Sequence, residues 1–251
     1  MKVLKIACAV LLAAFSAHAA AVGGLADVTL FDRSDGRQLP VYWHEGRAYV
    51  VGKPGNEYQL TVRSRQGEEV LAVMSVDGVN IISGETATTQ QSGYVLSPWR
   101  ALEVKGWRKD LARTAAFYFT SLPDSYAART GRPDNVGAIG VALFRKKRPE
   151  PPAEVSMLSR QAPASAGAAR AEAGNRSADQ SEKLGTGHGR SETSYARHVG
   201  FERASSEPAE TIVIYYDSYR NLLARGIVPQ QPLPRRPSPN PFPGFAADPP
   251  A

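Results

Sequence analysis

The sequence predicts an all-β fold, an antiparallel β-sandwich, with a jelly roll as one form that it could take. The first observation is the densest apolar stretch after residue 25, residues 70–83 with the sequence VLAVMSVDGVNIIS. The second is a series of roughly ten short β-like segments separated by Gly, Pro and Asp turns. The third is the scarcity of helical periodicity, which predicts only one or two short helices.

Residues 70–76 are the centre of this prediction. Successive side chains of a strand point to opposite faces, and here both faces are largely apolar. We therefore expect a central strand that is covered on both sides. Asp77-Gly78 follows directly and precedes a second apolar run, which predicts a two-residue hairpin loop because both turn positions need positive φ. A role for Asp77 as a ligand or an acid is the alternative to this turn.

The first 20 residues have the pattern of a signal peptide. Two lysines precede an apolar stretch over residues 6–15, and an A-x-A cleavage site ends at Ala19. The apolar stretch is too short to span a membrane. Cys8 is the single cysteine and lies inside this segment, so the mature chain is expected to form no disulfide. The predicted location is exported, either periplasmic or extracellular.

The charge balance of the expected mature chain is mildly basic. Removing residues 1–20 takes two of the 30 Lys and Arg and none of the 24 Asp and Glu, which leaves a formal charge of +4. Much of this excess lies in runs such as residues 145–148 and Arg235-Arg236, which are expected to be solvated. The sequence therefore predicts no specific binding of nucleic acid.

The other strands are predicted from the turns along the chain. Residues 57–63 alternate between apolar and polar side chains, which is typical of a strand with one exposed face. The further strands expected in the first half of the chain are residues 27–31, 38–43, 47–51, 93–96, 101–106, 115–120 and 138–144.

Two short helices interrupt the strands. Residues 126–129 follow the capping pair Asp124-Ser125 and stop before Gly131, and residues 218–225 stop at Gly226. Both helices are expected on the rim of the β core.

One face of the strand at residues 138–144 carries only small side chains. Ala138, Gly140 and Ala142 alternate with larger apolar residues, so another segment can approach this face closely. One of the two helices is the nearest candidate for that segment, and a ligand is the alternative.

The composition changes after this strand. Residues 146–192 are rich in Pro, Ala, Gly and Ser and are predicted to be a disordered insertion, because they offer few large apolar side chains to bury. Residues 195–202 and 211–217 look like strands again. Two isolated strands are marginal in water, so we expect them to return to the first region. The predicted single β-sandwich domain consists of residues 24–145 and 193–228.

The C-terminal segment, residues 229–251, contains nine prolines. Such a segment favours polyproline II and forms no folded core, so it is predicted to be a disordered spacer. A ligand for the groove of a partner protein is the alternative.

Catalytic patterns are scarce. The expected mature chain has three histidines, His44, His188 and His198, and no H-E-x-x-H or G-x-S-x-G motif. His188 lies in the Gly-rich residues 185–189, which lack the spacing of a phosphate-binding loop. No catalytic residue, cofactor or metal site is predicted. A glycosidase needs a pair of facing carboxylates, and the sequence gives no sign that any two of its acids converge. The available acids are Glu85, Glu103, Asp110, Asp124 and Asp134.

The candidate binding residues are Tyr94, Trp99, Trp107 and Arg108. An exposed aromatic ring beside basic groups can stack on a sugar ring or anchor a protein partner. Trp99 follows Pro98 in a predicted loop, and Trp107 directly precedes Arg108. For Trp107 the alternative is that its ring closes the end of the core.

Five segments stand out when they are read in order: VLAVMSVDGVNIISGETA, SGYVLSPW, GWR, SYAARTGRP and VGAIGVALF. Together they resemble a family of uncharacterised bacterial and phage proteins that look like secreted or virion-associated β-sandwiches. The resemblance covers about residues 40–145 and returns within residues 185–227, at FER and YYDSYRNLLARGI. It brings no activity and no catalytic residue, and the phage members imply, by analogy, a module for cell-surface attachment.

These observations favour an exported, non-catalytic module that binds a glycan or a protein surface in the cell envelope or outside the cell. The loops over residues 94–107 are the expected contact region. One alternative is a secreted hydrolase that acts on a cell-wall or extracellular polysaccharide. Another is a structural envelope protein that acts through its Pro-rich tail. The expected partner is a cell-surface glycan or an envelope protein, and the sequence sets no oligomeric state.

Overall fold

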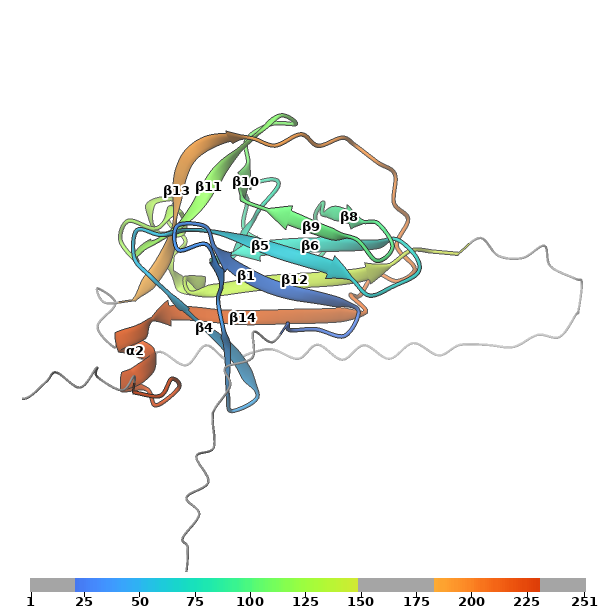
Figure 1. The fold of residues 1–251 in the computed structure, drawn as a ribbon. Helices are drawn as coiled ribbons and strands as arrows, with labels where there is room; N and C mark the ends of the chain where they lie inside the picture. Colours follow the sequence, from blue (N-terminus) through green and yellow to red (C-terminus); the bar gives the residue numbers. More distant parts are fainter. Residues whose placement is uncertain (1–20, 149–182, 231–251) are drawn as a thin grey trace, which may run out of the picture.

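Two β-sheets pack against each other around a common core (Figure 1). The computed structural model describes residues 21–148 and 183–230. The predicted signal peptide, residues 149–182 of the predicted insertion and the predicted tail from residue 231 onward lie outside the described residues. The sandwich prediction is confirmed in the described part of the chain, which is mostly β with short helices.

Each sheet contains seven strands. Sheet A has the order β10-β11-β5-β1-β2, with β13 paired to β11 and β9 paired to β5. Its strands are β1 (Ala26–Asp32), β2 (Arg37–Gln38), β5 (Glu57–Ser64), β9 (Ala101–Val104), β10 (Gly106–Arg108), β11 (Arg113–Ser121) and β13 (Leu184–Thr193). Sheet B has the order β3-β4-β14-β12-β6-β7, with β8 paired to β6. Its strands are β3 (Val41–His44), β4 (Arg47–Gly52), β6 (Val70–Val76), β7 (Val79–Asn80), β8 (Tyr94–Leu96), β12 (Ala138–Arg145) and β14 (Glu210–Ser218).

β6 is the central strand that the sequence predicts. It lies between β12 on one edge and the short β7 and β8 on the other. Met74 on its inner face is buried in the main core, and Val73 on its outer face is buried in a smaller cluster with Phe144. The predicted hairpin is also confirmed, since Asp77 and Gly78 have φ of 54° and 72° and connect β6 to β7.

The two predicted helices form where their capping residues stand. α1 (Tyr126–Arg129) begins after Ser125, whose side chain accepts a hydrogen bond from the Ala128 N–H. α2 (Tyr219–Ala224) begins after Ser218, which caps it in the same way. A 3₁₀ turn, η1 (Pro133–Asn135), follows α1. No helix in the described part of the chain is long and apolar enough to cross a membrane.

One pair of strands in sheet B departs from the antiparallel arrangement of the predicted sandwich. β14 lies between β12 and β4, antiparallel to β12 and parallel to β4. Parallel strands need a long connection, and residues 53–209 separate β4 from β14. The last part of this connection, after β13, passes along one end of the sandwich before it enters β14 (Figure 1).

The predicted disordered insertion is wrong in its last residues. Leu184–Thr193 is strand β13, which pairs antiparallel with β11 over nearly its whole length. Its glycines are sites of close packing, because a Cβ on Gly185 would lie 2.6 Å from Ser125 Cβ and one on Gly189 would lie 2.8 Å from Ala116 O. The folded region therefore resumes before residue 193.

The strand predicted at residues 195–202 is absent, and these residues form no ladder. Phe201 instead packs against the outer cluster around Phe144, and the Arg203 guanidinium lies 4.1 Å from the centre of the Phe144 ring. The basic run at residues 145–148 is less free than expected, because Lys146, Lys147 and Arg148 form ion pairs with Glu69, Glu202 and Glu68.

A buried hydrogen-bond chain joins the two sheets at Asp77. Besides forming the turn, the Asp77 carboxylate accepts the N–H of Gly137 at 2.9 Å, the N–H of Thr186 at 2.8 Å and the hydroxyl of Tyr216. Thr186 Oγ1 lies 2.6 Å from the Tyr216 hydroxyl and 2.7 Å from the Tyr58 hydroxyl. Since Tyr216 gives its single proton to Asp77, Thr186 must donate to Tyr216 and Tyr58 to Thr186. This chain connects β5 and β13 of sheet A with β14 and the β6–β7 turn of sheet B.

Burial raises the pKa of the Asp77 carboxyl from 3.8 to about 6, although the hydrogen bonds from Tyr216, Gly137 and Thr186 lower it in part. The folded protein therefore binds this proton more tightly than the unfolded chain does. The stability contributed by the bound proton is complete below pH 3.8 and is lost as the pH rises through 6.

The substitution Gly185→Ala is expected to lower the free energy of unfolding by about 1–3 kcal/mol, because its Cβ would overlap Ser125 and Val136. Gly200→Ala is the matched control, since a Cβ there meets no atom within 4 Å. Urea unfolding of both variants measures the difference. An unchanged stability for Gly185→Ala would contradict the packing explanation for the glycines of β13.

The substitution Asp77→Asn is expected to destabilise the protein and to change its pH dependence. Between pH 4 and 7 the free energy of unfolding of the unsubstituted protein should fall by about 2 kcal/mol relative to that of the variant, which has no titratable carboxyl at position 77. Asp35, Glu57 and Asp110, whose pKa values are lowered by their hydrogen bonds, are present in both proteins and cancel in the comparison. Parallel stability curves would show that Asp77 does not titrate in this range.

Candidate functional site

Tyr94 and Arg108 are brought together, but Arg108 is already engaged. Its Nε donates to the Tyr94 hydroxyl at 2.8 Å. The rest of the guanidinium donates to Ser194 O at 2.6 Å, to Ser194 Oγ at 2.9 Å and to Asp110 O at 3.2 Å. The side chain thus fastens the segment that follows β13 onto β10 and β8.

Trp107 lies inside the protein. Only 3% of it is exposed, and its ring meets Phe117 edge-on at a centroid distance of 4.7 Å. The ring closes the end of the core, which was the alternative to a binding role for Trp107. It is not accessible to a ligand in this structure.

Trp99 is the large exposed side chain of the predicted binding set. It is 62% exposed and has a φ of 59°, which is unusual for a bulky residue. Its N–H donates to Gln66 O, so it lies beside the turn between β5 and β6. Among the described residues, no hydrogen bond or ring contact connects Trp99 with Tyr94 or Arg108.

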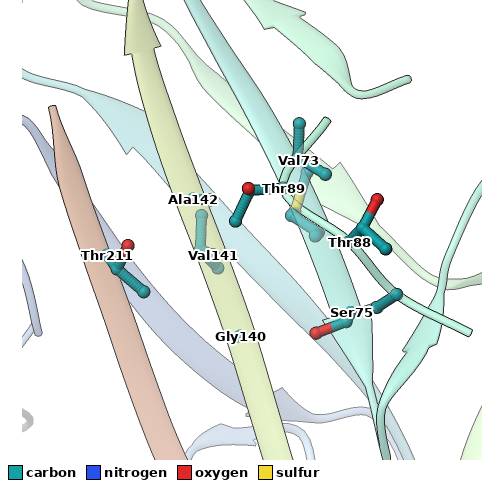
Figure 2. Close-up of a pocket in the computed structure, with 10 residues that line it drawn as sticks. Val73, Ser75, Thr88, Thr89, Gly140, Val141, Ala142 and Thr211 are labelled. Atoms are coloured by element: carbon teal, nitrogen blue, oxygen red, sulfur yellow. The ribbon is translucent and has the colours of Figure 1, made fainter. Parts of the chain in front are cut away.

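A shallow groove of 140 Å³ crosses the outer face of sheet B (Figure 2). Val73, Ala142 and Thr211 lie across three neighbouring strands, and Thr88 and Thr89 come from a separate loop beside them. This groove, termed the sheet B groove, exposes the small-residue face of β12. The expectation that a helix covers that face is wrong, because α1 packs against β13 and α2 against β14 and β4.

A larger hollow of 310 Å³, termed the polar hollow, lies between α1 and β13. It is lined by Asp124, Tyr126, Arg129, Thr130 and His188. Hydrogen bonds hold its walls in place. Ser121 Oγ donates to Asp124 Oδ2 at 2.7 Å, and the Thr130 hydroxyl donates to the Tyr126 carbonyl at 2.7 Å.

Two aromatic side chains, Tyr126 from α1 and His188 from β13, line the polar hollow, and the Arg132 guanidinium lies 5.9 Å from the centre of the Tyr126 ring. The rings of Tyr126 and His188 have centroids 5.4 Å apart, and the buried Trp107 ring lies against both, at 4.9 Å and 6.3 Å. The Trp107 and His188 planes are nearly parallel, at 12°. Trp107 therefore contributes to this site from behind, as a support for the rings that a ligand could contact.

The polar hollow has an excess of positive charge. Among the described residues, no hydrogen bond or ion pair engages the Arg129 guanidinium, whereas Arg132 next to it donates to Gly84 O and Thr130 Oγ1. Burial lowers the pKa of His188 from 6.5, and the neighbouring charges of Lys109 and Arg129 lower it further, so the imidazole is neutral at pH 7. The charged side chains that line the hollow are thus Arg129 and Asp124, and the cations of Arg132 and Lys109 lie nearby.

The polar hollow was not predicted from the sequence, because residues 185–189 look like a flexible Gly-rich segment. The signal that could have revealed it is the capped turn at Ser125, which places Tyr126 and Arg129 at a fixed position on the rim.

Neither hollow contains two facing carboxylates. Asp124 is the only acid that lines either of them in the described part of the chain. Of the other candidate acids, Asp110 pairs with Arg113 and Glu103 with Lys105. Within residues 21–148 and 183–230, no three His, Cys, Asp or Glu side chains gather in a way that could hold a metal ion.

Comparisons of the chain with protein-family models, with curated proteins and with solved structures find no match.

Proposed function

We propose that the protein is an exported, non-catalytic module that binds one sugar unit of an envelope or extracellular glycan in the polar hollow. The observation that carries this proposal is the presence of two aromatic rings, Tyr126 and His188, together with hydrogen-bonding side chains in one concavity. Ring faces stack against the apolar face of a sugar, and a few placed polar groups select its hydroxyls.

Several groups in the polar hollow are free to bind such a ligand. The Tyr126 hydroxyl and the Arg129 guanidinium have no hydrogen-bond partner among the residues that the structure describes. Asp124 uses one carboxylate oxygen for Ser121 and keeps the other as an acceptor. The volume of 310 Å³ suits a single sugar ring rather than a long segment of polymer.

The alternatives have less support. A glycosidase needs two carboxylates on either side of the scissile bond, and the polar hollow offers Asp124 alone. A role for the Pro-rich tail falls on residues outside the described part of the chain. Export follows from the sequence of residues 1–20, and the resemblance to bacterial and phage sandwich proteins agrees with a surface-binding role.

The proposal predicts that His188→Ala and Tyr126→Leu each weaken glycan binding about tenfold or more, because each removes a stacking face. Binding is measured by co-sedimentation and affinity electrophoresis of the purified protein with a panel of soluble cell-envelope polysaccharides. Tyr126→Leu keeps apolar volume against Trp107, and circular dichroism checks that both variants are folded.

Trp99→Ala is the control that separates the two candidate sites. It is expected to leave binding unchanged, because Trp99 lies in the loop between β8 and β9, beside the turn between β5 and β6, rather than in the polar hollow. Loss of binding in Trp99→Ala, with full binding in the two hollow variants, would move the site to the loop that the sequence predicts.

A further inference from the structure

We infer that the sugar bound in the polar hollow carries a carboxylate and that Arg129 is the residue that binds it. This inference rests on the proposed function and adds the chemical class of the ligand. A uronic acid unit of a polysaccharide has this chemistry: a ring with apolar and hydroxyl faces and one negative charge.

The first argument is that the Arg129 guanidinium lines a hollow and has no partner among the described residues. Nearby arginines in the described part of the chain are occupied by fixed partners: Arg108 by Tyr94 and Ser194, Arg113 by Asp110, Arg132 by Thr130 and Gly84, and Arg190 by Glu57. Arg129 instead lines a hollow with no partner among the described residues. A guanidinium binds a carboxylate through two parallel hydrogen bonds, so an empty position beside it suits that group.

The second argument is the sign of the local charge. Arg129 lines the hollow and Arg132 and Lys109 lie nearby, against the single carboxylate of Asp124. With His188 neutral at pH 7, these side chains favour an anion. A carboxylate meets less repulsion from Asp124 than a phosphate monoester, which carries nearly two negative charges at pH 7.

The third argument is the position of the rings. Tyr126 is the first residue of α1 and Arg129 the last, so both face the same hollow from one turn of helix, opposite His188 on β13. A sugar stacked on the ring faces would bring an exocyclic carboxylate toward the rim where Arg129 lies. Asp124 on the preceding turn remains available to accept ring hydroxyls.

The test is isothermal titration calorimetry of the purified protein with tetragalacturonate and with a neutral galactose tetramer. We expect tetragalacturonate to bind at least tenfold more tightly. Arg129→Gln should reduce binding of tetragalacturonate to the level of the neutral tetramer and should leave the neutral tetramer unaffected. Arg65→Gln, an exposed arginine that pairs with Asp27, is the matched control and should leave both affinities unchanged.

The outcomes separate this inference from the proposed function. Equal binding of the two tetramers, weakened by His188→Ala, would overturn the carboxylate and leave the sugar site standing. Stronger competition by galactose 6-phosphate than by galacturonate would also overturn it. If neither tetramer binds, both the sugar site and the carboxylate inference are contradicted. A preference for tetragalacturonate that survives Arg129→Gln would overturn the role of Arg129.

Discussion

The buried carboxylate of Asp77 is the constraint on which the arrangement of this sandwich depends. A carboxylate removed from water is costly unless its oxygens are hydrogen-bonded, and here three donors from three parts of the chain supply those bonds. One of these donors is the backbone of β13, a strand that returns from sequence far away. Sliding β13 by one residue would leave Asp77 without the Thr186 N–H and turn the Thr186 side chain away from Tyr58 and Tyr216. The buried hydrogen bonds of Thr186 thus fix the register of β13.

The position of the polar hollow follows from that register. His188 comes two residues after Thr186, and Gly185 contacts the capping residue Ser125, so the same strand places one wall of the hollow and supports the helix that forms the other. Trp107 fills the space behind both walls. A site built on a capped helix and a pinned strand needs little rearrangement to bind, which lowers the entropic cost of association.

The sequence was sufficient where the determining signals are local. Alternation over residues 57–63 and the Asp-Gly turn predict β5 and the β6–β7 hairpin, and Ser125 and Ser218 predict the starts of two helices. Prediction from the sequence failed where the structure depends on contacts between residues that are distant in the chain. The glycines of residues 185–189 look flexible until Ser125 and Ala116 are seen to occupy the space of their side chains. The parallel pairing of β14 with β4 likewise depends on segments that the local pattern does not contain.

The same distinction explains why composition says little about the ligand. The expected mature chain is basic by a few charges, but the structure cancels many of them in pairs, such as Arg33 and Arg190 with Glu57 and Glu192 on the sheet A surface. Recognition of a ligand depends on the charge that stays unpaired in the polar hollow, beside its aromatic rings. Because His188 is neutral at pH 7, that charge is limited to Arg129 and its neighbours Arg132 and Lys109, against Asp124. A small, localised charge gains modest affinity and acts mainly by discriminating between ligands of similar shape. The stacking surface would then set how tightly a sugar binds, and the unpaired guanidinium would set which sugar it is.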